Sequence, residues 1–374
     1  MQNKKKQFVS VCLVCPKAYA LLNPACRATF GGAEVDLFFL GTELSKDPFF
    51  AVSFITADYG QPPIEEIGSL QVIKSFRFNN NPWYCAWKIW KACRKANADI
   101  YMIKTASFGV PLTYYFCKFF SRVFIYRTAH SDECNGTYVQ KHPVAGRYFI
   151  NAIHNADVVF TQNISDKNNL YNTSAIPSQV IPNGHQIPPA SNAVRDIILW
   201  SGRTADFKHP ERFLELARHF PEEQFVMICQ KATEDHNYET LKQEASLIHN
   251  LTFHEYVSFS EISHYFARTK VFINTSDSEG FANTFIQAGA AGAAILSFAV
   301  NPDEFLTRYN CGLCCRGDMD KLKAGLAFLL DDQRYIEIGK NGRKYVEEKH
   351  DISTIVEQYK AIFVRLAEQK RRKR

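Results

Sequence analysis

The pattern most suggestive of chemistry lies in residues 275–292, where an acid and a glycine precede a run rich in alanine and glycine. The β-branched, apolar residues 271–274 come before it, so the sequence predicts a strand, a tight loop and the N-terminus of a helix. A helix N-terminus favours an anion through its dipole and its backbone N–H groups, and Gly280 lets a ligand come close to the backbone. The carboxylate of Glu279 is suited to accepting hydrogen bonds from hydroxyl groups. Together these groups predict a site for a sugar that carries phosphate; the alternative is a loop whose glycines serve only packing.

A pair of cations is the second chemical candidate. The expected strand at residues 196–200 is followed by Gly202 and Arg203, and Lys208 lies five residues further on, where a helix is expected to begin. Two cations at a strand end and a helix start could bind a diphosphate and offset the charge that grows on a departing nucleoside diphosphate. The alternative is a solvated Arg and Lys. Because a Lys near a helix N-terminus is electrostatically disfavoured, the functional interpretation is preferred.

The elements that must position these residues follow from apolar runs that alternate with helical patterns. In the first half we predict strands at residues 8–14, 51–56, 71–73, 100–103, 123–126, 158–161 and 179–181. Between them we predict helices near residues 32–46, 83–96, 109–120, 144–155 and 164–171. Alternation of this kind indicates βαβ units and a doubly wound parallel sheet. The proline-rich residues 182–191 are interpreted as a linker between domains.

The same alternation begins again after the linker. Strands are predicted at residues 196–200, 224–229, 251–253, 271–274 and 294–298, and helices near 209–219, 237–248, 260–268 and 283–292. A further helical stretch covers about residues 332–366. We therefore predict an α/β protein with an N-terminal domain of residues 1–185, a C-terminal domain of residues 191–348, and a last helix with a basic tail at residues 349–374. Ligands of such sheets bind beyond the carboxyl ends of the strands.

Bulk properties limit the protein class. A chain of 374 residues is too long for one ordinary core, and 46% hydrophobic with 22% charged residues is typical of a globular protein. No apolar run approaches the roughly 20 residues of a membrane helix. The apolar stretch at residues 8–14 is interrupted by Cys12 and is followed by Cys15, so we interpret it as a buried first strand rather than a signal peptide. These features predict a cytoplasmic protein.

The segment around Glu279 resembles the signature of the family-four retaining glycosyltransferases, which have the two-domain GT-B architecture. The family pattern is an acid, then residues similar to Gly-Phe-Gly, then a second acid eight positions after the first. Here Gln287 stands at the position of the second acid. The Gly-Arg … Lys arrangement of Gly202, Arg203 and Lys208 is also similar to the family's.

The resemblance implies a role for each matching residue. Arg203 and Lys208 would bind the donor phosphates, and Glu279 would bind hydroxyl groups of the donor sugar. Backbone groups near Gly280, Phe281 and Ala282 would assist. Gly202 is also expected to bind the donor, and Gln287 would occupy the ribose position.

Two features of the first domain also match the family. Gly31 and Gly32 precede a predicted helix, and a Gly-Gly-Ala-Glu-like loop at this point would let backbone N–H groups approach a phosphate. His130 follows the strand at residues 123–126, where family members often place a catalytic histidine that contacts the transferred sugar. Ser131 and Asp132 compete with His130 for this position, and a plain polar loop is the alternative. His185 is a lesser candidate, interpreted as a hinge residue.

Metal binding and thiol chemistry are both disfavoured by sequence context. Asp318-Met-Asp320 fits the Asp-x-Asp motif of metal-dependent glycosyltransferases, but it precedes a helical pattern, so Asp318 or Asp320 is interpreted as a helix N-cap. Arg203 and Lys208 would already supply the positive charge of a metal. The eleven cysteines are scattered and are interpreted as reduced, buried thiols. We expect neither a metal nor a cofactor besides the nucleotide sugar.

The charge is uneven and indicates an anionic partner. Of the net +6, residues 1–189 carry 19 Lys/Arg and 12 Asp/Glu (+7), residues 190–364 carry 19 and 25 (−6), and the last ten carry six and one (+5). No nucleic-acid-binding motif is recognisable, so an anionic membrane surface or lipid carrier is the expected partner. Trp83, Trp87 and Trp90 lie on a basic helix that either covers the sheet or lies on a membrane. The basic tail is expected to be exposed.

The sequence thus predicts a retaining, hexosyl-type glycosyltransferase that moves a sugar from a nucleotide-sugar donor to an acceptor hydroxyl. By the resemblance, the acceptor is a glycan or a lipid-linked glycan, and the setting is polysaccharide or lipid-linked glycan synthesis. The uneven charge predicts that this cytoplasmic protein is peripheral at the inner face of the membrane. One alternative is a sugar-nucleotide epimerase of the same fold. Another is a non-catalytic sugar-nucleotide-binding subunit, which Gln287 makes credible.

Overall fold

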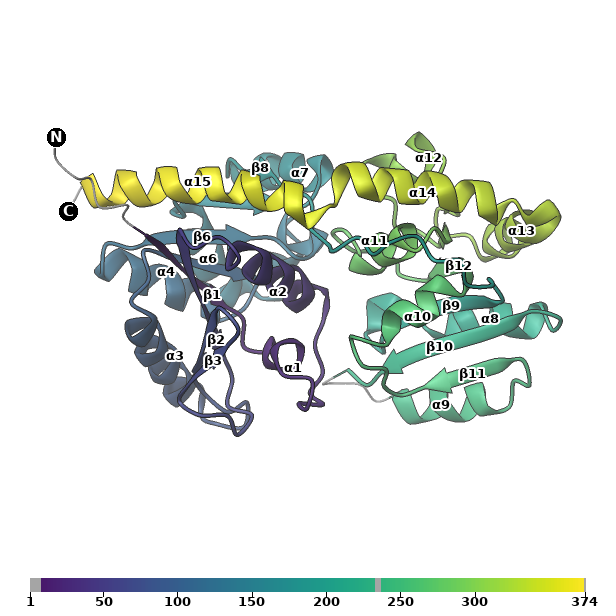
Figure 1. The fold of residues 1–374 in the computed structure, drawn as a ribbon, viewed down its shortest axis with the longest axis horizontal. Helices are drawn as coiled ribbons and strands as arrows, with labels where there is room; N and C mark the ends of the chain where they lie inside the picture. The colour runs from purple at the N-terminus through teal and green to yellow at the C-terminus, as the bar shows by residue number, and fades with distance from the viewer. Residues whose placement is uncertain (1–7, 233–236, 373–374) are drawn as a thin grey trace. The chain divides into compact units, whose positions relative to one another are not determined.

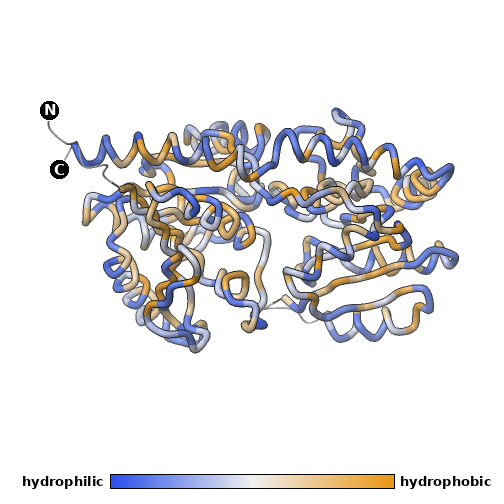
Figure 2. The backbone as a smooth tube through the Cα atoms, in the orientation of Figure 1, coloured by the Kyte–Doolittle hydropathy of each residue, from blue (hydrophilic) through white to orange (hydrophobic). Residues whose placement is uncertain are grey.

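The computed structural model describes residues 8–232 and 237–372. The chain divides into two compact units (Figure 1): the first contains Met1–Gln186 and Ile352–Arg374, and the second contains Ile187–Asp351. Within the described residues each unit has one sheet, and the strands of both sheets are largely apolar (Figure 2).

The first sheet has eight strands in the order β3-β4-β2-β1-β5-β6-β7-β8 within the described residues. These strands are β1 (Val9–Val14), β2 (Phe50–Thr56), β3 (Ile64–Ile67), β4 (Leu70–Lys74), β5 (Ile100–Lys104), β6 (Val123–Arg127), β7 (Val158–Thr161) and β8 (Gln179–Val180). All neighbours pair in parallel except β3 and β4. The central strands are buried on both faces, as the continuous apolar runs in the sequence predict.

Helices cover both faces of this sheet. The helical segments are α1 (Tyr19–Leu22), α2 (Gly32–Leu44), α3 (Pro82–Ala96), α4 (Gly109–Phe119), η1 (Ser131–Glu133), α5 (Thr137–Lys141), α6 (Pro143–His154), α7 (Ile164–Ser174) and α15 (Ile352–Arg372). Apolar residues of α2 and α15 share one core cluster with the strands. Those of α3, α4 and α6 share a second cluster on other strand side chains. The C-terminal helix α15 therefore helps to build the core of the first unit.

The second sheet is entirely parallel, in the order β11-β10-β9-β12-β13-β14 within the described residues. Its strands are β9 (Ile197–Arg203), β10 (Gln224–Gln230), β11 (Leu251–His254), β12 (Thr269–Asn274), β13 (Ala294–Ser297) and β14 (Gly312–Cys314). The helical segments are η2 (Asp206–Lys208), α8 (Glu211–His219), α9 (Tyr238–Ser246), α10 (Ile262–Ala267), α11 (Asn283–Ala290), η3 (Pro302–Glu304), α12 (Phe305–Arg308), α13 (Met319–Leu330), η4 (Asp331–Gln333) and α14 (Tyr335–Lys349). Two core clusters take side chains from this sheet.

Short elements were missing from the sequence prediction. The edge strand β3 has the sequence Ile-Glu-Glu-Ile and is partly exposed, so it shows no apolar run. Likewise, β14 has only three residues and α5 buries none of its side chains. The helical stretch predicted at about residues 332–366 is two helices, because the chain leaves helical geometry at His350.

Candidate active site

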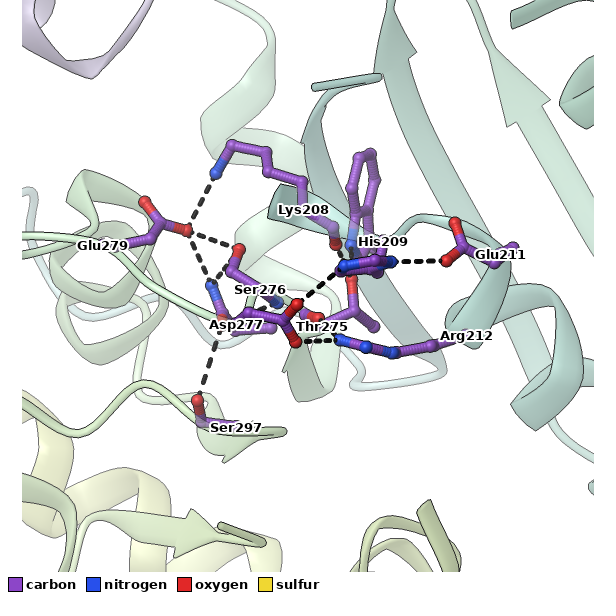
Figure 3. A network of polar contacts seen from close by, with 11 residues as sticks. Lys208, His209, Glu211, Arg212, Thr275, Ser276, Asp277, Glu279 and Ser297 are labelled. Atoms are coloured by element: carbon purple, nitrogen blue, oxygen red, sulfur yellow. Dashed lines mark hydrogen bonds and ion pairs between the residues drawn. The ribbon is translucent and has the colours of Figure 1, made fainter. Parts of the chain in front are cut away.

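The carboxyl ends of β9 and β12 create the site in the second unit. These strands are neighbours in the parallel sheet, so the loops that follow Arg203 and Asn274 emerge side by side. The β9 loop carries Lys208 and the β12 loop carries Glu279. Lys208 Nζ lies 2.8 Å from Glu279 Oε1 (Figure 3). The structure thus brings together two residues that the sequence analysis selected separately.

Glu279 is held by three donors on one oxygen. Besides Lys208, Oε1 accepts hydrogen bonds from the Ser276 hydroxyl at 2.7 Å and from Asn274 Nδ2 at 3.1 Å (Figure 3). Its side chain is only 13% exposed. Burial acts to raise the pKa of Glu279, but the charge and hydrogen bond of Lys208, with the bonds from Ser276 and Asn274, outweigh it and leave that pKa below its ordinary value. Glu279 is therefore a fixed carboxylate at neutral pH.

A hydrogen-bonded chain through Thr275 and Trp200 positions the backbone of Lys208. The Thr275 hydroxyl donates to the carbonyl of Lys208 at 2.5 Å and accepts the indole N–H of Trp200 at 2.8 Å. Gly202 makes room for this arrangement, since a Cβ there would lie 3.0 Å from the Trp200 ring and 3.3 Å from Lys208 Cδ. The predicted Gly202 therefore serves the position of Lys208 by having no side chain.

A second polar cluster, absent from the sequence analysis, fastens the same two loops. Asp277 binds His209 Nε2 and Arg212 Nη1, each at 2.7 Å, and His209 Nδ1 lies 2.7 Å from Glu211 (Figure 3). Burial acts to raise the pKa of Asp277, but Arg212 and His209 outweigh it and lower that pKa. Arg212 also donates to the Thr275 carbonyl at 2.8 Å. The signal in the sequence was the run of polar residues directly after two apolar strands.

Arg203 and Gln287 lie on the elements expected of them, without side-chain partners in the described part of the chain. Arg203 is the last residue of β9 and is partly exposed; its guanidinium forms no ion pair with the described acids. Gln287 lies on α11, and its partly exposed side chain makes no hydrogen bond to any described residue. Both side chains have polar groups that a ligand could use.

The residues after Glu279 lead into α11. Ala282 is the N-cap of this helix, whose first turn contains no acid. The Phe281 ring is buried in the core, with centroids 5.1 Å from Phe305 and 4.8 Å from His350. The Phe281 side chain therefore cannot contact a nucleotide sugar, and any contact must involve the backbone. The family resemblance likewise implies backbone contacts at residues 280–282.

In the first unit, His130 lies three residues beyond the end of β6. It is the N-cap of η1, and its Nδ1 accepts a hydrogen bond from the Asp132 amide at 3.1 Å. The Asp132 carboxylate lies 3.4 Å from the same nitrogen and 3.1 Å from Lys141. Ser131 begins the 3₁₀ turn. The His130 side chain is 24% exposed, so the ring can reach a ligand from this loop.

Buried Glu133, which the sequence analysis did not single out, fixes the His130 loop. Its carboxylate accepts hydrogen bonds from the Ala129 amide at 2.9 Å, from the Ala106 amide at 3.1 Å and from the Tyr126 hydroxyl at 2.7 Å. Burial raises the pKa of Glu133 above its ordinary value, although these hydrogen bonds act against it. The loop is therefore anchored to β6 and to the segment that follows β5.

The glycine loop of the first unit lies where the sequence predicted, but one of its amides is engaged. Gly31 is the N-cap of α2, and its N–H donates to the Glu34 carboxylate at 2.7 Å. Gly32 is the first residue of the helix. A phosphate could use the Gly31 amide only if Glu34 moved aside.

Four polar side chains of the first unit form a buried cluster that the sequence analysis missed. Asp36 on α2 lies 2.8 Å from Lys104 Nζ and 2.6 Å from Arg127 Nε, and Asn183 Oδ1 accepts from Arg127 at 2.7 Å. Burial lowers the pKa of Lys104 to about 8, against the opposing effect of Asp36. Lys104 and Arg127 end β5 and β6, so charged residues at the ends of apolar strands were the available signal.

The structure assigns ordinary structural roles to two lesser sequence candidates, His185 and Asp318. His185 is buried 4.3 Å from the Phe39 ring, and burial lowers its pKa to about 4, so the imidazole is neutral. Asp318 is the N-cap of α13, as predicted, and accepts hydrogen bonds from the amides of Asp320 and Lys321. Among the described residues, no cluster of three or more His, Cys, Asp or Glu could hold a metal ion. All eleven cysteines are free thiols.

Comparison with known proteins bears on both the fold and the second unit. Residues 186–345 match the family described as "Glycosyl transferases group 1". None of the curated proteins matches the chain.

Solved structures share the fold over nearly the whole chain. Sucrose-phosphate synthase from Thermosynechococcus elongatus is 17% identical, with a TM-score of 0.78 over 96% of this chain and 99% of that one. HepE from Anabaena, solved with UDP-glucose, is 14% identical, with a TM-score of 0.72 over 96% and 98%. A mutant of TarM from S. aureus, solved with Fondaparinux, α-GlcNAc-glycerol and UDP, is 12% identical, with a TM-score of 0.74 over 95% and 100%.

These likenesses confirm the predicted fold class. The chain has the GT-B fold, with two Rossmann-like α/β sheets. The match of residues 186–345 to the glycosyltransferase group 1 model supports a glycosyltransferase that uses a nucleotide sugar.

Proposed function

We propose that the protein is a retaining glycosyltransferase that moves a hexosyl unit from a nucleotide-sugar donor to an acceptor hydroxyl without a metal ion. The observation that carries the proposal is the Lys208–Glu279 pair, held at the carboxyl ends of β9 and β12 inside the matched domain. HepE was solved with UDP-glucose and TarM with UDP and glycan ligands, which supports a nucleotide donor and a glycan acceptor.

The geometry suits charge development on a leaving diphosphate. An ammonium group has three N–H donors, and the structure shows one of them on Glu279, so Lys208 can bind a phosphate oxygen while it stays in place. In the reaction the bond from the anomeric carbon to the diphosphate breaks and its electron pair goes to the diphosphate. Lys208 and Arg203 would stabilise that charge.

The carboxylate of Glu279 suits the sugar. It is charged at neutral pH and is fixed through three hydrogen bonds on Oε1, and we expect it to accept hydrogen bonds from hydroxyl groups of the donor sugar. The acceptor oxygen then bonds to the anomeric carbon on the face that the diphosphate left, and the acceptor proton goes to a diphosphate oxygen. Gln287 would bind the ribose and His130 would contact the transferred sugar.

The acceptor we propose is a growing polysaccharide or a lipid-linked glycan, which sets the working place at the cytoplasmic face of a membrane. None of the helices in the described residues is long and apolar enough to span a bilayer.

A panel of nucleotide sugars tests the proposal. Incubation without acceptor should release free sugar slowly, and ¹H NMR of the first product should show the anomeric configuration of the donor. Glu279→Ala and Lys208→Ala should abolish release, whereas EDTA should change little. An isomerised nucleotide sugar would instead identify an epimerase, and tight binding without turnover would identify a binding subunit.

A further inference from the structure

An exposed aromatic and basic surface covers the outer side of α3, α4 and α6 in the first unit. The three helices are neighbours, since α3 packs against α4 and α4 against α6 (Figure 1). Their inner sides fill the same core cluster. Eight large apolar side chains are exposed on these helices and at Phe108, the N-cap of α4: Trp83, Tyr84, Trp87, Phe108, Tyr115, Phe119, Val144 and Tyr148. We refer to these eight side chains and the basic residues between them as the outer helical face.

The exposure of these side chains is high for their size. Trp83 is 86% exposed, Phe108 85% and Phe119 74%. Exposed apolar residues that lie singly are ordinary, but large ones grouped on adjacent elements mark an interaction surface. This grouping favours the outer helical face as an interaction surface.

Charge identifies the kind of occupant. Helices α3, α4, α5 and α6 contain no Asp or Glu, whereas their basic residues are Lys88, Lys91, Arg94, Lys95, Lys118, Lys141 and Arg147. The cations lie among the aromatic rings, and Lys91 Nζ is 3.7 Å from the Trp87 ring centroid. Lys141 is paired with Asp132 of the preceding turn at 3.1 Å, and the other six cations leave a basic surface that complements an anion.

The composition separates a lipid surface from a protein partner. Protein interfaces are depleted in Lys, whereas Lys and Arg mixed with Trp and Tyr are typical of segments at the boundary of an anionic bilayer. Lys and Arg can keep the charged group among the lipid headgroups while their stems lie along apolar side chains. We infer that the outer helical face docks the first unit on a membrane that contains anionic lipid.

The basic tail is a weaker docking element than the sequence suggested. Lys370 Nζ lies 3.1 Å from Asp157, and Arg371 lies 2.7 Å from Asp99 while also donating to the Phe8 carbonyl. These two cations are neutralised within the first unit. Arg372 is exposed, and Lys373 and Arg374 lie outside the described residues.

Vesicle binding measures this docking without donor or turnover, so it can fail or succeed independently of the proposed transferase activity. The probes are vesicles of phosphatidylcholine with or without phosphatidylglycerol, and binding is followed by co-sedimentation. Each basic residue near the surface contributes about fivefold to the partition coefficient, so Lys91→Glu/Lys95→Glu should weaken binding about 25-fold or more. Trp83→Ser should weaken it several-fold. Circular dichroism checks that the variants remain folded.

Matched controls lie in the second unit. Leu247→Ser removes a side chain that is 84% exposed, and Lys340→Glu reverses an exposed charge on α14; neither should alter vesicle binding. Tryptophan fluorescence adds a direct readout, because Trp83 and Trp87 are exposed whereas Trp200 is buried. Anionic vesicles should shift the emission to the blue, and Trp83→Ser/Trp87→Ser should lose the shift.

Three outcomes would overturn the inference. The first is equal binding to neutral and anionic vesicles, and the second is equal binding by the parent and the Lys91→Glu/Lys95→Glu variant. The third combines two results: the protein binds polyuridylate as tightly as anionic vesicles, and the vesicles cause no blue shift of the tryptophan emission. That result would assign the outer helical face to nucleic acid.

Discussion

The ammonium group of Lys208 lies 2.8 Å from the carboxylate of Glu279, a residue 71 positions further along the chain. Adjacent parallel strands bring the two loops together, and Thr275 fastens the backbone of Lys208 to the end of β12. A cation and a carboxylate are thus fixed relative to each other in the structure without a donor. Such prior organisation is what electrostatic catalysis requires.

Removing the Lys208 charge should slow transfer much more than it weakens donor binding. Lys208→Met keeps the aliphatic stem but cannot stabilise the leaving diphosphate, so kcat should fall about 10²–10³-fold. Lys270→Met is the matched control, because Lys270 is also partly buried and pairs with Glu223 at 2.7 Å in the same unit. Steady-state kinetics of both variants check the prediction, and equal losses in the two would contradict it.

Replacing Gln287 by Glu should tighten nucleotide-sugar binding. Charge-assisted hydrogen bonds to the ribose hydroxyls contribute about 1.5–3 kcal/mol, against about 1 kcal/mol for neutral ones, which corresponds to roughly tenfold in Kd. Calorimetric titration measures the change. Gln243→Glu on α9 adds the same charge at an exposed position and should leave Kd unchanged. Weaker or unaltered binding by Gln287→Glu would remove Gln287 from the ribose site.

Glu279 should make folding stability depend on pH on the acid side. Its pKa in the folded state is lowered, so the network favours folding above the unfolded pKa of about 4.3 and loses that contribution as the pH falls through the folded value. Urea unfolding between neutral and acid pH should therefore show a smaller loss of stability in Glu279→Gln than in the parent. If the free energy of unfolding fell equally with pH in the two proteins, the pKa of Glu279 would not be lowered in the folded state.

The buried Asp36 cluster should matter for stability. Asp36→Asn leaves Lys104 and Arg127 buried without a carboxylate, so the free energy of unfolding should fall by about 3–5 kcal/mol. Asp58→Asn is the control, since Asp58 pairs with the exposed Arg77 and should cost at most about 1 kcal/mol. Urea denaturation distinguishes the two, and similar small losses would show that the cluster is not a stabilising unit.

Thr275 should act through Lys208. Thr275→Val keeps the shape but removes the hydroxyl that links the Trp200 N–H with the Lys208 carbonyl, leaving a buried donor unsatisfied at a cost of about 1–3 kcal/mol. We expect kcat to fall with little change in KM, and Thr275→Ser should restore it. If both variants lose stability without a kinetic effect, Thr275 has only a structural role.

Much of the secondary structure followed from local pattern. The strands β1, β5 and β6 were predictable because continuous apolar, β-branched runs have few other stable arrangements. The Asp318 cap followed from an acid placed just before a helical pattern. The edge strand β3 was not predictable, because its polar residues and its pairing with β4 alone carry no periodic signal.

The sequence by itself determined the βαβ organisation, because chain order and hydrophobic period specify which elements form. Its resemblance to a known family implied the GT-B fold class and the residues of the candidate site. Only the tertiary structure decided which of those residues meet. It joined Lys208 to Glu279, turned the Phe281 ring into the core, and gave the Gly31 amide to Glu34. It also assembled the cluster of Asp36 with Lys104 and Arg127, which lie on separate elements. Strand order and side-chain packing set these contacts, and both depend on interactions between residues far apart in the chain.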